Sequence, residues 1–483
     1  MPQLCFTDLD ALDSVVTLDG VTSKLSVETI ALARSFGLVD GMPFILSDDG
    51  SYDHDINRFF RTCPTMGVRS LNSLRAYGRD IIIWLRFLAE RRGGKSLWSV
   101  DREDIAAFYE ARRFSDPPHR ISASSWNRST AVLDKLYRWA MDEKLIAKLP
   151  FTYKRVWTPS RGGAAVTISS NCAYEPAARR GDVRIISLEH YLKFRDIGLR
   201  GRLPDGREDP TWCGRNGERN ALFAELLVTT GLRLQEASSL LVMELPDQQQ
   251  YSKQRSVAVR LAAETAKGGN ARDYRLPLRL LKRLHEYIEL QRANSVARYN
   301  IRRCTNQIKR PIIATDLSRQ SLQVDSTEFS SRVHLDRIKP KERARLVHSF
   351  NMEPLALWLT EGGMPMSMAA WQVIFRRASS RCQRFGIDID VSPHVLRHVF
   401  ATNMLALLLR EQIGWMLEER TGRMSPAYRR MIGDPLLKLQ ILMGHRSIKS
   451  TYIYLDYLDD SQALIDAAVD QWGFDVAAMR DTV

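Results

Sequence analysis

The segment 392–460 constrains this chain more than any other. It contains SPHVLRHVFATNML and, about forty residues later, LMGHRSIKSTYIYLDY. The apolar side chains of the first sequence recur at helical spacing and predict a helix. His394 and Arg397 are three residues apart, so they share one face of that helix. The sequence therefore predicts an imidazole and a guanidinium directed at one point.

The second sequence ends in a run of apolar and aromatic residues. His445 follows a glycine, and Tyr454 comes nine residues after His445. A phosphodiester transesterification needs cations for the charge that builds on the phosphate, and a nucleophile such as a phenol. Imidazole, guanidinium and phenol groups supply both, so the chemistry requires no metal and no cofactor.

A third segment, TGLRLQE at 230–236, adds a second arginine. Gly231 is a residue at which one helix can end. Arg233 and Glu236 then share a face of the next helix. We expect Arg233 to join the basic group and Glu236 to have a structural role, orienting a basic neighbour.

These three segments, in this order, resemble the motifs of the tyrosine recombinases, or phage integrases. TGLRLQE resembles the box with that family's first catalytic arginine, HVLRHVFAT its His-x-x-Arg box, and MGHRSIKSTYIY the segment that leads to its nucleophile. The resemblance implies a mainly α protein with a small antiparallel β-sheet. It would have an N-terminal helical, SAM-like core-binding domain and an α+β catalytic domain.

The resemblance also implies a role for each motif residue. Arg233 and Arg397 would bind the scissile phosphate, and His445 would add a hydrogen bond to it. His394 would help to move the proton of the nucleophile. Tyr454 would attack phosphorus, leaving a 3′-phosphotyrosyl bond and a free 5′ hydroxyl.

Lys267 is a candidate general acid. The alternating residues of 256–261 and the strand-like 275–278 flank Lys267-Gly-Gly-Asn, a turn signal, and so predict a β-hairpin. The family presents a catalytic lysine on such a hairpin, and an ammonium can protonate the leaving 5′ oxygen. The alternative is a solvated lysine without a catalytic role.

The nucleophile has two neighbours of the same type. Tyr452, Tyr454 and Tyr457 lie within six residues. Tyr454 has the spacing from the histidine that the family shows. The other two are interpreted as packing or DNA-facing aromatic residues.

The rest of the chain predicts several domains, because 483 residues are too many for one compact core. Helical patterns begin near Ser70, Asp101 and Ser122, and a fourth short helix is expected around Leu145. The predicted organisation is an N-terminal extension (1–58), a helical core-binding domain (59–156), a linker (157–184) and a catalytic domain (185–483) that has insertions near 295–350 and 408–435 and a C-terminal helical tail.

A formal charge of +14 favours a polyanionic partner. Nucleic acid is the first candidate, and the family resemblance implies double-stranded DNA as the partner. Charged residues on helices are commonly only a solvated face, but some of these are candidates for phosphate contact. The candidate DNA-binding residues are Arg69, Arg75, Arg79, Arg128, Arg302 and Arg303.

Other features set the expected context. Six scattered cysteines indicate reduced thiols, and no apolar run reaches membrane-spanning length. We expect a cytoplasmic protein that joins the nucleoid when it is bound to DNA. The family implies a homotetramer on two DNA sites, with accessory recombinases or DNA-bending proteins as further partners. Size and insertions favour an enzyme that mobilises or integrates a genetic element over a minimal chromosome-dimer resolvase, and leave open whether the reaction is integration, excision, resolution or transposition.

Two other functions remain open from sequence. A type IB topoisomerase shares much of the chemistry, although its motifs differ. A non-catalytic DNA-binding relative would have the positive net charge but would not cleave DNA. Relaxation of supercoiled DNA without strand exchange would indicate the first, and binding without a covalent adduct the second.

Overall fold

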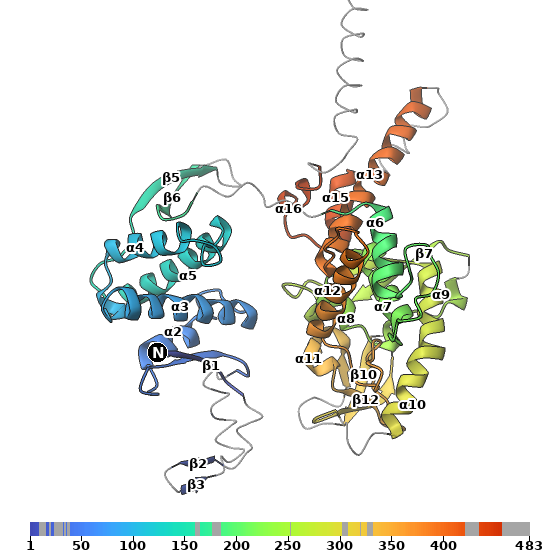
Figure 1. Cartoon of the computed structure of the whole chain (residues 1–483), viewed down its shortest axis with the longest axis horizontal. Coiled ribbons are helices and arrows are strands. Elements are labelled where there is room, and N and C mark those ends of the chain that lie inside the picture. Colours follow the sequence, from blue (N-terminus) through green and yellow to red (C-terminus); the bar gives the residue numbers. More distant parts are fainter. Residues whose placement is uncertain are drawn as a thin grey trace, which may run out of the picture. The chain divides into compact units, whose positions relative to one another are not determined.

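The computed structural model divides the chain into two compact units, Met1–Gly181 and Asp182–Val483, and each is described by itself (Figure 1). The structure describes residues 1–8, 16–18, 21–23, 32, 35, 39–159, 165–175, 185–251, 253–301, 308–318, 320–325, 332–420 and 434–455. Among these residues, no helix is both long enough and apolar enough to span a membrane.

Four helices form the centre of the first unit. They are α2 (His54–Thr62), α3 (Leu71–Arg91), α4 (Arg102–Arg113) and α5 (Ala123–Asp142), with a 3₁₀ turn at Leu97–Ser99. Aromatic side chains fill the space between them, and the Trp84 indole donates a hydrogen bond of 2.8 Å to the Tyr137 hydroxyl. A capping box at Asp101 and Asp104 fixes the start of α4.

The helices predicted near Ser70, Asp101 and Ser122 are confirmed, but the fourth is elsewhere. Residues around Leu145 form turns, and Lys144 has a φ of 61°. A left-handed residue interrupts a helix, so the chain turns at this point. The fourth helix is α2, which begins at an Asp53 cap.

The first residues of the chain pack on these helices. Strand β1 (Gln3–Phe6) pairs antiparallel with β4 (Pro43–Leu46), with Gln3 opposite Leu46. Ile45 is fully buried in the same core as the helices. β2 (Val16–Leu18) and β3 (Val21–Ser23) form a separate ribbon. The predicted 1–58 extension therefore contributes directly to the helical unit.

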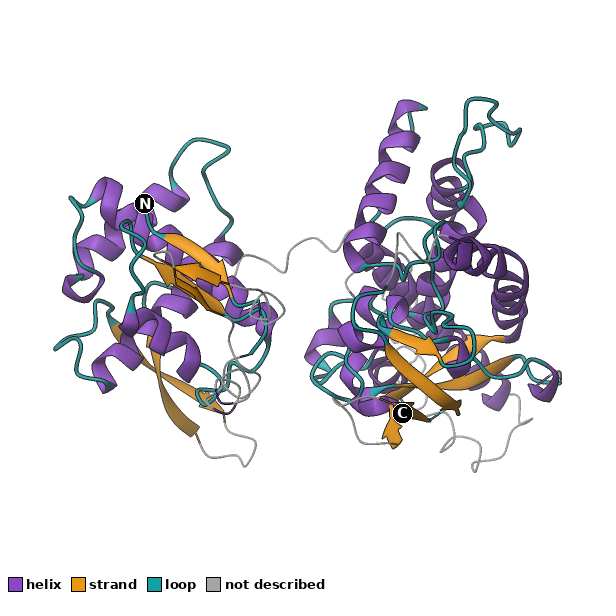
Figure 2. Ribbon diagram, turned by 90° about the horizontal axis from the view of Figure 1, so that it is seen from below, coloured by secondary structure: helices purple, strands orange, loops and turns teal. Residues whose placement is uncertain are grey.

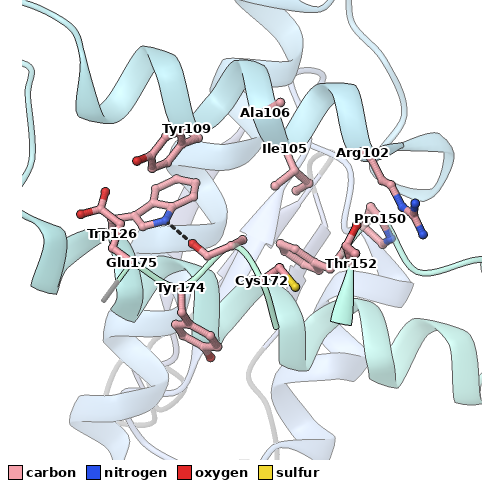
Figure 3. Close-up of a pocket in the computed structure, with 12 residues that line it drawn as sticks. Arg102, Ile105, Ala106, Tyr109, Trp126, Pro150, Thr152, Cys172, Tyr174 and Glu175 are labelled. Carbon is pink, nitrogen blue, oxygen red and sulfur yellow. Dashed lines mark hydrogen bonds between the residues drawn. The ribbon is translucent and has the colours of Figure 1, made fainter. Parts of the chain in front are cut away.

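The described part of the predicted linker contains strand residues. β5 (Tyr153–Pro159) pairs antiparallel with β6 (Ala165–Asn171), so residues 157–159 and 165–171 of the predicted linker are strand residues. Residues after β6 return to the helices, where the Trp126 indole donates to the Ala173 carbonyl at 2.8 Å. A pocket of about 420 Å³ lies beside this contact, between α4, α5 and residues 150–152 and 172–175 (Figure 3).

The second unit contains helices and short strands, among them a β-hairpin (Figure 2). Phe223 and Trp371 stack with ring centroids 3.7 Å apart in its core. The hairpin strands are β7 (Ser256–Leu261) and β8 (Arg272–Pro277). The helices are α6 (Leu188–Lys193), α7 (Gly217–Thr230), α8 (Leu234–Ser238), α9 (Leu278–Tyr287), α10 (Ala293–Ile301), α12 (Met368–Arg384), α13 (Pro393–Arg420), α15 (Pro435–Met443) and α16 (Lys449–Tyr452). π-Helical turns lie at Phe194–Leu199 and Ile288–Arg292, and 3₁₀ turns at Val242–Glu244, Gln249–Tyr251 and Ala263–Thr265.

The first predicted insertion contains a small sheet. Its strands are β9 (Ile312–Leu317), β10 (Ser321–Asp325), β11 (Arg332–His334) and β12 (Leu346–His348), with a 3₁₀ turn at Leu335–Arg337 and α11 (Pro340–Arg343). They lie in the order β11-β10-β9-β12, and only the β12–β9 pair is parallel. Arg343, 2% exposed, pairs with Glu244 at 2.8 Å and so fixes this sheet to the body of the unit.

The second predicted insertion begins as helix. α13 continues to Arg420, so the chain does not leave the helix at residue 408. The rest of that insertion (421–433) and the predicted C-terminal tail lie outside the described residues.

Candidate active site

Arg397 lies at the meeting point of the three sequence motifs. Its side chain is 2% exposed, in the first turns of α13. One nitrogen donates to the Gly231 carbonyl, and the other donates to the Met443 carbonyl at 2.5 Å. Those carbonyls end α7 and α15. The buried guanidinium therefore joins the TGLRLQE segment to the Gly-His segment.

Arg233 lies beside Arg397. α7 ends at Gly231 in a left-handed conformation, and the next turn makes Arg233 the N-cap of α8. Its Nη2 lies 3.5 Å from the Gly444 carbonyl. Its side chain is 25% exposed, whereas that of Arg397 is closed off. The two predicted phosphate-binding arginines are thus brought together, with Arg233 on the accessible side.

Gly231 makes this arrangement possible. Its φ is 65°, and a Cβ there would lie 2.3 Å from a ring carbon of Phe400. Left-handed strain and overpacking add together at such a position.

We expect Gly231→Ala to lower the free energy of unfolding by about 3 kcal/mol. Gly386→Ala is the matched control, because Gly386 has a φ of 76° but open space around the Cβ position. It should cost only about 1 kcal/mol. Urea unfolding of both variants measures the difference; equal losses would mean that contact with Phe400 is unimportant.

Glu236 holds two arginines in place. Its fully buried carboxylate accepts hydrogen bonds from Arg233 at 2.9 Å and from Arg272 at 2.9 and 2.7 Å, and it also accepts the Arg233 backbone N–H at 2.8 Å. Burial alone would raise the pKa of Glu236, but the bonds and charges of Arg272 and Arg233 outweigh it and keep that pKa below its usual range. The structural role expected for Glu236 matches these contacts.

Replacing Glu236 by Gln should cost about 3 kcal/mol of stability near neutral pH, because two guanidiniums lose their buried counter-charge. The depressed pKa gives the sign of the pH dependence. The carboxylate contributes fully above the ordinary glutamate pKa, and its contribution falls as the pH drops through the folded-state value. The stability gap between the wild type and Glu236→Gln should therefore narrow below about pH 4. A gap that does not change with pH would contradict this role.

The nucleophile candidate lies among three histidines. Tyr454 is 2% exposed, and its hydroxyl lies 3.0 Å from Nδ1 of His398. The ring of His445 is nearly parallel to that of Tyr454, at 6.2 Å between centroids. His445 Nδ1 bonds the Thr451 hydroxyl at 3.0 Å. His394 lies against His398, with ring centroids 4.3 Å apart.

The electrostatics of this cluster favour an anion. Burial, followed by the charge of Arg233, lowers the pKa of Arg397 to about 9. Burial and nearby positive groups lower the pKa of His398 and that of His445 to about 4. Positive charge is therefore costly in this cluster. A phosphate would relieve that cost, so the arrangement suits a phosphodiester.

Lys267 lies on the connection between β7 and β8, and the predicted hairpin is confirmed. The connection spans ten residues and includes a 3₁₀ turn, so it is longer than a tight turn. The glycines at 268 and 269 both have positive φ values. The Lys267 side chain is exposed, and its charge contributes to the lowered pKa of His394, after burial, Arg397 and Arg233. Lys267 is thus on the same side of the unit as the arginines.

The candidate DNA-binding arginines have different surroundings. Arg69 and Arg79 are exposed, while Arg75 donates to the Gly41 carbonyl at 3.1 Å. Arg128 pairs with the buried Asp80 at 2.9 Å, which fixes its guanidinium at the surface of α5. Arg302 and Arg303 lie outside the described residues.

Sequence reasoning missed two residues of the site, His398 and Arg272. His398 comes one helical turn after His394, and that i, i+4 spacing was a usable signal. Arg272 begins β8, and no local pattern links it to Glu236, 36 residues earlier.

Comparisons with known proteins identify the family of this chain. The family model for the phage integrase N-terminal SAM-like domain matches residues 56–144, and that for the phage integrase family matches residues 211–408. Together they cover more than half of the chain. The chain belongs to the phage integrase family of tyrosine recombinases. This recombinase therefore has the helical and catalytic domains expected from its sequence.

Individual relatives are distant. Tyrosine recombinase XerD of Mycobacterium leprae (strain TN) is 24% identical over 386 residues, 79% of this chain and 86% of the relative. Tyrosine recombinase XerD of Corynebacterium glutamicum is 33% identical over 107 residues, 22% of this chain and 26% of the relative. A solved structure of XerH site-specific recombinase bound to palindromic difH substrate is 14% identical, with a TM-score of 0.47, and the match covers 87% of this chain and 85% of that one.

Family membership decides between the functions left open by sequence. The recombinase is an enzyme of site-specific DNA recombination, and the match favours this activity over that of a type IB topoisomerase.

Proposed function

We propose that this recombinase cleaves and rejoins DNA through a 3′-phosphotyrosyl bond to Tyr454. The observation that carries the proposal is the convergence of Arg233, Arg397, His445 and Tyr454, from three separate segments, on one buried cluster. Guanidinium and imidazole groups lie around a phenol there, and that is the combination a phosphoryl transfer to tyrosine needs.

Each of these basic groups has a distinct task. Arg233 and Arg397 bind the non-bridging oxygens of the scissile phosphate and stabilise the charge that develops in the transition state. His445 donates a further hydrogen bond. His394, more exposed than His398, packs against His398 and supports the cluster. The covalent bond conserves the energy of the phosphodiester, so rejoining needs no nucleotide cofactor.

Lys267 protonates the leaving 5′ oxygen. Lys267→Ala should slow cleavage of ordinary DNA by about 10²-fold or more, because an alkoxide is a poor leaving group. A substrate with a 5′-bridging sulfur should be cleaved almost as fast by the variant as by the wild type, since a thiolate leaves without a proton. Cleavage rates on the two substrates measure this. Equal losses on both would mean that Lys267 only binds DNA.

The biological reaction we propose is movement of a mobile genetic element. The proposal is supported by the size of the chain and by its two insertions. Both exceed what a minimal enzyme with these motifs would need. The reaction would take place in a homotetramer holding two DNA sites, in association with the chromosome, with accessory recombinases or DNA-bending proteins where the element demands them. Arg69, Arg79 and Arg128 would contact phosphates of the bound duplex, with Arg75, Arg302 and Arg303 as further candidates.

A two-site assay tests the proposed reaction. The target site is first recovered from DNA covalently attached to the wild-type protein. A plasmid that carries two copies of this site should then yield recombinant products when it is incubated with the protein. Relaxed plasmid without exchanged segments would instead indicate a topoisomerase.

A further inference from the structure

The Tyr454 hydroxyl has a specific partner, and it is not the histidine of the His-x-x-Arg motif. His398 Nδ1 lies 3.0 Å from the hydroxyl oxygen, and the two rings are 5.7 Å apart between centroids. Tyr454 is 2% exposed, and His398 is half-buried on α13. Water therefore has little access to this hydroxyl, and the histidine is its neighbour when attack begins.

The direction of the hydrogen bond follows from the two groups. Burial, the largest influence, raises the pKa of Tyr454, although Arg397 and Arg233 oppose it. The phenol is consequently protonated at neutral pH and donates its proton. A neutral imidazole accepts through Nδ1 and then carries its own hydrogen on Nε2. Attack on phosphorus requires this phenolic proton to leave.

The geometry points to His398 as the catalytic residue that takes the Tyr454 proton during cleavage and returns it during rejoining. This inference rests on the proposed function. In cleavage, the Tyr454 Oη–P bond forms as the P–O5′ bond breaks. The Oη proton passes to His398 Nδ1, and the 5′ oxygen gains a proton from Lys267. Rejoining reverses each transfer, so the cycle consumes nothing.

The surroundings suit this task. In the free protein, burial and then the neighbouring His394 and Arg397 keep the imidazole neutral and able to accept a proton. A bound phosphate would place negative charge beside it and stabilise the imidazolium as it forms. The other two histidines make different contacts. His445 Nδ1 forms a hydrogen bond with the Thr451 hydroxyl, and the His394 ring makes a T-shaped contact with the ring of His398.

A pair of substitutions separates proton acceptance from positioning. His398→Asn places an amide near the position of Nδ1, where it can hold the phenol but cannot take its proton. His398→Phe removes both abilities. His394→Asn is the matched control, one turn earlier on the same helix. Circular dichroism and DNA binding would establish that each variant is folded.

The assay is formation of the covalent adduct on a nicked duplex that traps it. The duplex carries the site recovered from DNA that is attached to the wild-type protein. If the wild type forms no adduct, the proposed function itself is refuted, and this role of His398 is refuted with it. Given wild-type cleavage, we expect His398→Asn and His398→Phe both to lose about 10²-fold or more in rate. His394→Asn should lose clearly less. Cleavage by His398→Asn within a few-fold of the wild-type rate would overturn the inference.

Discussion

Tyr454→Phe should abolish covalent attachment to DNA while leaving the fold and DNA binding intact. The substitution removes a single oxygen, which is the atom that attacks phosphorus. The lost hydrogen bond to His398 should cost only about 1 kcal/mol of stability, since the ring keeps its buried position. Adduct formation on a nicked duplex with the cognate site, beside a gel-shift measurement of affinity, distinguishes loss of chemistry from loss of binding.

Tyr452→Phe is the matched control. Tyr452 lies two residues earlier, at the end of α16, and is 41% exposed. This exposed position contrasts with that of Tyr454 among the histidines. We expect the control to form adducts at close to the wild-type rate. Retained adduct in Tyr454→Phe, or its loss in Tyr452→Phe, would mean that a different tyrosine is used.

Arg397→Ala should lose both activity and stability. The guanidinium provides the hydrogen bonds to the Gly231 and Met443 carbonyls, and both would lose this donor. We expect the free energy of unfolding to fall by about 2 kcal/mol, because relief from burying a charge offsets part of the loss. Cleavage should fall by at least about 10³-fold, since transition-state charge and active-site geometry are affected together.

Arg233→Ala is the informative comparison. Arg233 is partly exposed, and Glu236 keeps its bonds to Arg272 without it. Its loss should slow cleavage by about 10²–10³-fold yet change stability by no more than about 1 kcal/mol. Cleavage kinetics and urea unfolding of the two variants measure the contrast. Equal destabilisation, or unchanged cleavage in either variant, would contradict the arrangement of the phosphate site.

Sequence motifs predicted most of the site because their local geometry is encoded locally. Gly231 and Gly444 both adopt left-handed conformations at helix ends, which is why TGLRLQE and MGHRSIKSTYIY each contain a glycine at that point. The helical spacing of His394 and Arg397 likewise follows from the helix period. Family resemblance supplied the order of the segments and the role of each residue.

The features that sequence did not predict depend on contacts between distant residues. The pairing of Glu236 with Arg272 joins a helix to a strand, and the bond of His398 to Tyr454 spans 56 residues. The sheet in the first insertion and the hairpin in the predicted linker were missed for a related reason. Short alternating strands are stabilised by their partners, so their patterns are weak in isolation.

The central claim is that Tyr454 forms a covalent bond to a 3′ phosphate of DNA. The most direct test is to isolate the protein from its host under denaturing conditions, digest it with nuclease and trypsin, and identify the nucleotide-bearing residue by fragment mass spectrometry. Lys449 ends the preceding tryptic peptide, so Tyr452, Tyr454 and Tyr457 fall in one peptide and must be resolved by fragmentation. We predict a nucleotide on Tyr454, linked through its 3′ phosphate. A nucleotide on another residue, a 5′ linkage, or no linked nucleotide would contradict the account.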